Sequence, residues 1–101
     1  LGWTRKNNFP GEPRDESFTF ELNGRKYIGG GQNGYQVFDD IWEYDADSDN
    51  WNFYTKMPFK RFGSVAFTIN GKLYIGYGFN YDNGLNTLMD FYEYDPEYPV
   101  F

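Results

Sequence analysis

The sequence contains an internal repeat, in which two units of about fifty residues follow the same pattern. The stretch SFTFELNGRKYIGGG at 17–31 aligns without a gap with SVAFTINGKLYIGYG at 64–78, at an offset of 47 residues. DIWEYDAD at 40–47 aligns with DFYEYDPE at 90–97, at an offset of 50. A period of about fifty residues is typical of architectures in which each unit buries one face against the next. We therefore expect a single domain made of two similar units.

Each unit predicts short strands. Phe18, Phe20 and Leu22 alternate with polar residues, a period of two that is typical of a strand with one buried face. Asn-Gly follows at 23–24 and again at 70–71, and it is the strongest short signal for a two-residue hairpin. Loops are expected at about 31–38 and 78–89, and no 3.6-residue period is sustained anywhere. The sequence therefore predicts an all-β fold.

Taken in order, these pieces resemble the kelch repeat: an alternating strand, Asn-Gly, YIGGG, a variable loop, DIWEYD, an acidic turn and a tryptophan. The resemblance covers nearly the whole chain twice, with Tyr77 in place of one glycine and Phe101 in place of the tryptophan at Trp51. It implies two four-stranded antiparallel blades of a kelch-type β-propeller, whose blades surround a central channel. In this interpretation the whole of 1–101 is propeller, divided into an outermost strand of a preceding or closing blade (1–8), a first repeat (14–56) and a second repeat (61–101).

Two assemblies are compatible with two blades, because propellers have about four to eight. The chain is either a fragment of a longer propeller or a two-blade unit of an oligomeric ring, in which three copies would give six blades. Its first residue is Leu1 rather than Met, which favours a processed or excised piece. The expected partners are therefore further kelch blades in the same or other chains, together with a protein or glycan ligand.

The acidic stretch DADSDNW at 45–51 resembles the first half of a calcium loop. Asp45, Asp47 and Asp49 fit its first three ligand positions, but position 6 is Asn50 rather than glycine and position 12 is Lys56 rather than glutamate. Asp, Ser and Asn side chains also stabilise turns by bonding to their own backbone. We therefore predict a polar turn between the third and fourth strands, with no metal and no cofactor.

Composition excludes several function classes. The chain has no cysteine and no histidine, which removes thiol nucleophiles and any Ser-His-Asp triad within it. Copper oxidases similar to galactose oxidase are excluded for the same segment, because their imidazole ligands have no candidates here. The net charge of −6 argues against nucleic acid as a partner, and no apolar run is long enough for membrane insertion.

Repetition separates structural from functional residues, because a catalytic group is rarely needed once per blade. The pair Glu43 and Glu93 could suggest two-carboxylate glycosidase chemistry, yet both occupy the same slot of the repeat. The same argument assigns structural roles to the aspartates at 40 and 90 and at 45 and 95. We predict no catalytic residue from these positions.

Two candidate ligand-binding regions remain. Arg14 and Arg61 precede the first strand of each unit, where they either face the mouth of the ring or pair with a turn carboxylate. The loops at 32–39 and 79–90 differ between the units and mix amides with aromatic rings, which suits polar ligands. Alternatively these are solvated loops that Phe38 and Leu88 anchor. The candidate ligand-binding residues are Arg14, Gln32, Asn33, Tyr35, Gln36, Arg61, Asn80, Tyr81, Asp82 and Asn86.

We expect a non-catalytic module that binds protein or carbohydrate through the loops between second and third strands. The alternative is a sugar-active enzyme on a kelch propeller, such as a sialic acid mutarotase-like epimerase, and a purely structural role is a third possibility. FPGEPR and DIWEYDADSDNW resemble repeats of bacterial exported kelch proteins, which implies a secreted, periplasmic or cell-surface location.

Overall fold

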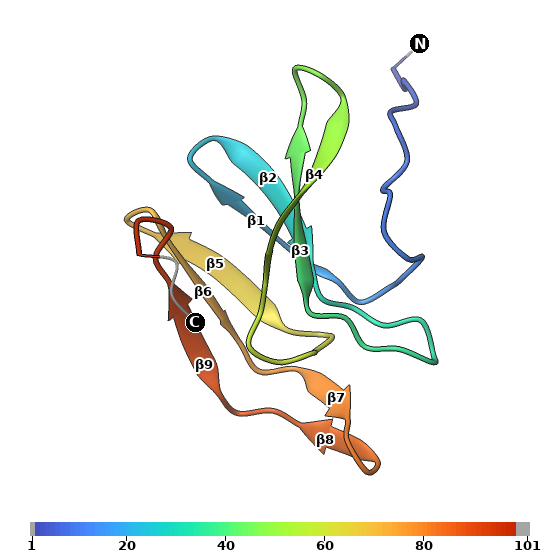
Figure 1. The fold of residues 1–101 in the computed structure, drawn as a ribbon, viewed down its shortest axis with the longest axis vertical. Coiled ribbons are helices and arrows are strands. Elements are labelled where there is room, and N and C mark those ends of the chain that lie inside the picture. Colours follow the sequence, from blue (N-terminus) through green and yellow to red (C-terminus); the bar gives the residue numbers. More distant parts are fainter. Residues whose placement is uncertain (1, 99–101) are drawn as a thin grey trace.

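The computed structural model describes residues 2–98, which form β-strands and no helix. The first sheet has the order β1-β2-β3-β4 and the second the order β5-β6-β9, while β7 and β8 pair as a separate hairpin (Figure 1). The strands are β1 (Phe18–Leu22), β2 (Arg25–Gly29), β3 (Asp40–Asp45), β4 (Asn50–Lys56), β5 (Val65–Ile69), β6 (Lys72–Gly76), β7 (Phe79–Tyr81), β8 (Leu85–Thr87) and β9 (Phe91–Tyr94). All pairs are antiparallel, so the predicted all-β fold of two blades is confirmed.

The internal repeat extends to the register of the strands. In the first sheet Gly29 pairs with Phe18 on one side and with Ile41 on the other. In the second sheet Gly76, 47 residues later, pairs with Val65 and Phe91, the counterparts of those two neighbours. A one-residue slip would turn every side chain to the opposite face, so the shared register means that both sheets present the same pattern of faces.

The turns at Asn23-Gly24 and Asn70-Gly71 have the predicted form. Asn23 and Gly24 have φ angles of 52° and 79°, and Asn70 and Gly71 have 51° and 77°. Positive φ at both central positions is the requirement that makes Asn-Gly favourable in two-residue hairpins.

The acidic stretch forms the turn between β3 and β4. The amide N–H of Asp47 donates to the carboxylate of Asp45 (3.0 Å), and the hydroxyl of Tyr44 donates to the carboxylate of Asp49 (2.8 Å). These bonds engage the carboxylates of Asp45 and Asp49 within the turn. Among residues 2–98 no group of three or more His, Cys, Asp or Glu side chains is placed to hold a metal ion.

The expectation of an open loop over 78–89 is wrong in its central part. Residues 79–87 form the β7–β8 hairpin, in which Tyr81 pairs with Leu85 around Asp82-Asn83-Gly84. Asn83 and Gly84 have φ angles of 60° and 107°, so a further Asn-Gly pair closes this hairpin. The first-unit loop carries only the isolated bridges of Gln32 to Asp15 and to Val37.

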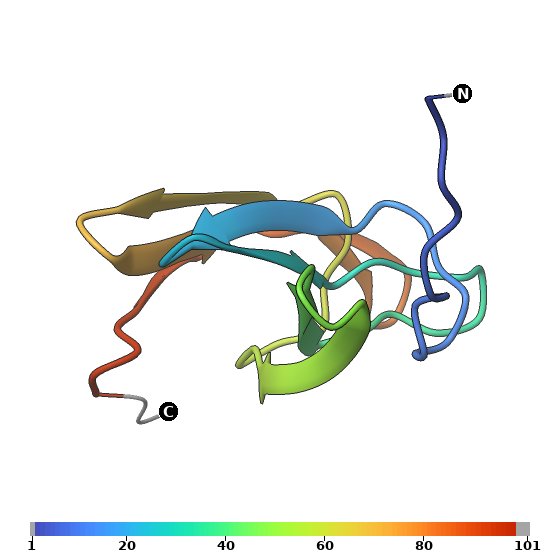
Figure 2. The ribbon, with the colours of Figure 1, turned by 90° about the horizontal axis from the view of Figure 1, so that it is seen from above.

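The core lies between the two sheets, with β1 against β5. Figure 2 shows the sheets from above, with the N-terminal segment leading away from them. Burying one large apolar side chain stabilises the fold by about 1.5–3 kcal/mol, so the contact between the two sheets is the main packing interaction of the chain. The buried cluster consists of Phe18, Phe20, Leu22, Tyr27, Ile41, Met57, Leu73 and Ile75.

The second sheet has an apolar face on the side away from the core. This face carries the counterparts of the residues that the first sheet buries, but here they are exposed. Val65, Phe67 and Phe91 are 45%, 42% and 45% exposed, whereas their counterparts Phe18, Phe20 and Ile41 are at most 7% exposed. The second sheet therefore presents to solvent the same kind of apolar face that the first sheet buries against it.

β1 to β4 lie within 14–56 and β5 to β9 within 61–101, and the boundaries of the two repeats stay predictions. Phe101, predicted to stand in place of the tryptophan in the second repeat, lies outside the described residues. Residues 2–8 form no strand, although Phe9 packs edge-on against the rings of Trp42 and Trp51 (centroids 5.5 and 5.4 Å apart). The assignment of 1–8 to another blade stays a prediction.

Candidate functional site

The two repeated arginines form the ion pairs that were one of the two predicted roles. Arg14 reaches β3 and donates to the Asp40 carboxylate (Nη2 to Oδ2, 3.0 Å) and to the carbonyl of Gly30 (3.3 Å). Arg61 repeats this geometry in the second unit, bonding to Asp90. The Arg61 residue is only 1% exposed, so its side chain braces the fold. A direct role of either arginine in ligand binding stays a prediction.

The carboxylates Glu43 and Glu93 also have repeated partners. Glu43 accepts hydrogen bonds from Arg25 (2.6 Å) and from the hydroxyl of Tyr27 (3.1 Å). Glu93 accepts the equivalent bond from Tyr74 (3.2 Å) and lies 3.3 Å from the ammonium group of Lys72. Burial, followed by the charge and hydrogen bond of Glu43, raises the pKa of Tyr27 to about 12. These glutamates join neighbouring strands, in agreement with the structural role that their repetition predicts.

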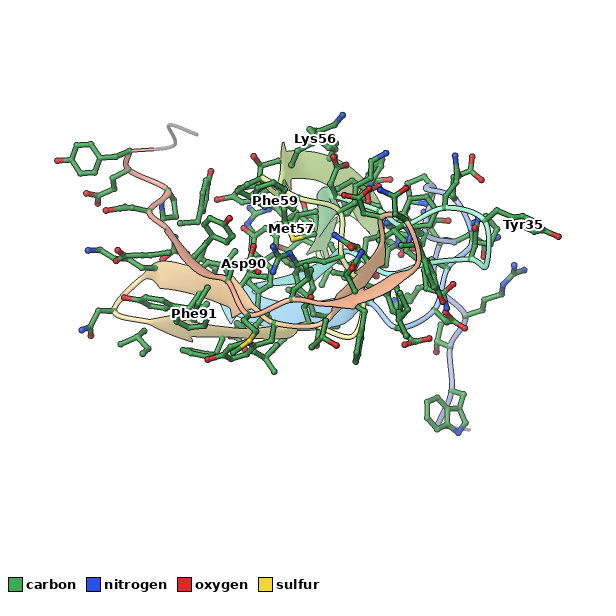
Figure 3. All side chains as sticks on the ribbon, turned by 90° about the horizontal axis from the view of Figure 1, so that it is seen from below. Tyr35, Lys56, Met57, Phe59, Asp90 and Phe91 are labelled. Atoms are coloured by element: carbon green, nitrogen blue, oxygen red, sulfur yellow. The ribbon has the colours of Figure 1, made fainter. Side chains whose placement is uncertain are left out.

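Pieces of both units meet in one groove of about 700 Å³, which we call the loop groove. It is lined by residues 35–39 of the first-unit loop, by Lys56 and residues 58–60 of the linker from β4 to β5, and by residues 80–82 of the β7–β8 hairpin. Figure 3 shows Lys56 at the end of β4, Phe59 on the linker, and Tyr35 projecting outward from its loop. The groove thus depends on both blades and on the chain segment that joins them.

Backbone hydrogen bonds hold the walls of the loop groove together. The N–H of Met57 donates to the carbonyl of Asp39 (2.7 Å), and the N–H of Arg61 donates to the carbonyl of Phe38 (3.2 Å). The carbonyl of Arg61 in turn accepts from the N–H of Gly31 (3.0 Å). The linker is therefore fixed to the first-unit loop at its start and near its middle.

Half of the predicted ligand-binding residues line this groove: Tyr35, Gln36, Asn80, Tyr81 and Asp82. Tyr35 is 97% exposed, and Tyr81 is 57% exposed with one face of its ring against Phe62 (centroids 5.2 Å apart). The ring of Tyr35 and the other face of Tyr81 are therefore available to stack on a ligand. Exposed rings beside amide groups are suited to a polar ring-shaped ligand such as a sugar.

The other polar loop residues are occupied in holding their loops. The Gln32 amide donates to Asp15 and Glu16 (2.9 and 3.0 Å). The Asn33 side chain accepts from the N–H groups of residues 35 and 36 (3.0 and 2.8 Å). Asn86 donates to the carbonyl of Asp82 (2.6 Å) across the β7–β8 hairpin. These three residues do not line the groove.

Seven further groove residues were not among the candidates: Val37, Phe38, Asp39, Lys56, Pro58, Phe59 and Lys60. Four of them belong to the linker or the end of β4, outside the variable loops between second and third strands. Within the described part of the chain, the carboxylates of Asp39 and Asp82 have no hydrogen bond or ion pair. They are the two unpaired carboxylates of the groove.

A second cavity of about 540 Å³ lies between the sheets, beside β9. Its walls include Ile41, Met57, Leu73 and Ile75, which belong to the core or its margin. Because these walls are mainly apolar and continuous with the packed interior, we assign this space to packing between blades rather than to a polar ligand.

Within residues 2–98, the structure contains no helix that is long and apolar enough to span a membrane.

Comparison with known proteins shows what the chain is similar to. It is 32% identical over 78 residues to N-acetylneuraminate epimerase of Yersinia enterocolitica serotype O:8, covering 69% of this chain and 20% of that protein. It is 33% identical over 84 residues to N-acetylneuraminate epimerase of Escherichia coli strain K12, covering 77% and 23%. No protein-family model matches.

A solved structure described as that of YjhT superposes with a TM-score of 0.69 and 34% identity, over 77% of this chain and 25% of that chain. This likeness supports the propeller fold. The chain spans about a fifth to a quarter of the length of the proteins that it matches.

Proposed function

We propose that the chain supplies two adjacent kelch-type blades of a sugar-active propeller similar to N-acetylneuraminate epimerases, and that the loop groove contributes to its sugar site. The observation that carries this proposal is the convergence of both unit loops and the linker on one polar, aromatic groove in a chain about one-third identical to those epimerases. This favours the enzymatic alternative over the non-catalytic module first expected from the sequence.

Exchange of anomers at a hemiketal carbon requires only one base and one acid. A base takes the proton of the anomeric hydroxyl while the bond from the anomeric carbon to the ring oxygen breaks, and an acid protonates that oxygen. Closure of the ring on the other face returns both protons, so the step needs no oxidant and no cofactor. Asp39 and Asp82 are the groove residues suited to this transfer, and Tyr35 and Tyr81 can stack on the sugar.

The experiment is to follow anomer exchange of N-acetylneuraminate by NMR with the intact protein that carries this chain. We expect faster exchange than in buffer. If Asp39 or Asp82 is the essential acid–base group, its replacement by asparagine should lower the exchange rate about 10²–10⁴-fold. Asp47→Asn, in the turn between β3 and β4, is the matched control and should leave the rate unchanged. No acceleration by the wild-type protein would rule out the enzymatic proposal.

Non-catalytic sugar binding remains the second candidate, because the rings of Tyr35 and Tyr81 are so open to solvent. Saturable binding of a glycan without faster anomer exchange would favour it. The exported location also stays a prediction, which fractionation of cells that express the intact protein can test.

A further inference from the structure

We propose that Lys56 and Lys60 make the loop groove selective for a sugar that carries a single carboxylate, over neutral sugars and over sugars with several negative charges. This inference deepens the proposed function and rests on it. It concerns Lys56 at the end of β4 and Lys60 in the linker from β4 to β5, which neither the sequence patterns nor the comparisons assign.

The first observation is that these two lysines lack partners, whereas other cations of the two sheets have them. Within residues 2–98, neither Lys56 nor Lys60 has a carboxylate within 4.0 Å or a side-chain hydrogen bond. By contrast, the basic residues within 4.0 Å of a carboxylate are Arg14, Arg25, Lys26, Arg61 and Lys72. In a chain with 15 acidic and nine basic residues, unpaired lysines are not explained by a shortage of acids.

The second observation is their placement. Lys56 ends β4, opposite Asp40 in the register, and Lys60 directly precedes Arg61. The linker between them is held at Met57 and Arg61 by the backbone bonds to the first-unit loop. Both residues therefore line the groove from a segment that the backbone bonds hold in place, and the ligand does not have to order that segment.

The third observation is the sign of the remaining charges. Asp39 and Asp82 line the same groove as the lysines, so two negative and two positive groups surround the space. A ligand with one carboxylate can lie against an ammonium group and keep its neutral hydroxyl and amide groups near the aspartates. A ligand with several negative charges would meet repulsion from the aspartates, which lowers its affinity.

The test measures binding by titration calorimetry of the intact protein with N-acetylneuraminate and with its uncharged methyl ester. We expect the double variant Lys56→Gln/Lys60→Gln to weaken binding of the acid roughly tenfold, the loss that corresponds to one charge-assisted hydrogen bond. Binding of the ester should not change. Lys72→Gln, which removes a paired lysine outside the groove, is the matched control and should alter neither. Equal weakening of the acid and the ester, or no weakening of either, would overturn the inference.

A second probe separates this inference from the proposed function. Backbone amide NMR shifts of groove residues are followed during titration with glucuronate, glucose and glucose 6-phosphate. If wild-type protein does not bind N-acetylneuraminate, the proposed function fails. The lysine inference still stands if glucuronate perturbs the groove more than either other sugar does, and if the double variant loses that response. The absence of any preference for glucuronate would refute it.

Discussion

The guanidinium group of Arg61 forms two hydrogen bonds with the carboxylate of Asp90, at 3.0 and 2.8 Å. It also donates to the carbonyl of Tyr77 (3.3 Å), while the backbone of the same residue bonds to the first-unit loop. One residue therefore joins the first blade, the linker and the second sheet. Arg14 makes the same side-chain contacts one unit earlier, so each blade begins with the same brace.

Loss of this brace should destabilise the protein strongly. Arg61→Met should lower the free energy of unfolding by about 2 kcal/mol, because it removes a fully buried guanidinium group and leaves the partly exposed carboxylate of Asp90 and the carbonyl of Tyr77 without their donor. Urea denaturation of the intact protein measures the loss. Lys72→Met is the control, since Lys72 is partly exposed in its pair with Glu93 and should change stability little. Equal losses in the two variants would contradict the assignment of Arg61 as a structural brace.

Acid should weaken the same brace. Hydrogen bonds and the charge of Arg61 lower the pKa of Asp90, even though burial opposes this. Burial likewise opposes the ionisation of Asp40, but hydrogen bonds from Arg14 and Trp42 outweigh it and leave that pKa lowered as well. A carboxyl group whose pKa is lower in the folded state stabilises the fold at pH values above its unfolded-state pKa of about 4. That stabilisation is lost as the pH falls through the folded-state pKa.

We therefore expect unfolding free energy to be steady from neutral pH down to about 4 and to fall below it. Asp90→Asn should be less stable than wild type at neutral pH and should have a shallower acid limb. Denaturant midpoints measured at a series of pH values test this. A variant whose acid limb parallels that of the wild type would show that Asp90 contributes nothing to acid unfolding.

Gly30 should tolerate a side chain worse than Gly24 does. Both have positive φ angles, of 61° and 79°, so alanine is strained at either position. A Cβ at Gly30 would lie 2.7 Å from the carbonyl oxygen of Arg61, whereas a Cβ at Gly24 would meet nothing within 4 Å. Gly24→Ala should cost about 1–2 kcal/mol from the backbone alone, and Gly30→Ala should cost more. Thermal denaturation compares the two, and equal costs would mean that the linker does not press on Gly30.

The repeat predicted the fold well because both units pair their strands in the same register. Phe18 and Phe20 alternate as they must to face a neighbour, and Asn23-Gly24 closes its hairpin as expected. The β7–β8 hairpin was missed although Asn83-Gly84 carries the same turn signal. The period of the repeat places that pair inside a variable loop, and the repeat pattern took precedence over the local signal.

The candidate site was only half predictable, because it depends on which segments meet in space. Tyr35 and Tyr81 could be selected from loop composition, since exposed aromatics beside amides stand out in sequence. Lys60 could not, because its importance comes from the approach of the linker to loops more than twenty residues away on either side. Asn33 looked like a ligand residue, but its side chain closes its own turn, and composition cannot distinguish these two uses of an amide.

The exposed face of the second sheet should make the isolated 101-residue chain associate. Val65, Phe67 and Phe91 occupy the slots of buried residues in the first sheet, and contiguous apolar surface of this kind drives association in water. Phe67→Lys should therefore reduce the apparent mass in light scattering at equal concentration, whereas Phe20→Lys, at the equivalent but buried position, should unfold the chain. A discrete trimer of the wild-type chain would favour the oligomeric ring, and open-ended association would favour a fragment of a longer propeller. A wild-type chain that stays monomeric, or a Phe67→Lys chain that associates as strongly as wild type, would show that this face does not drive assembly.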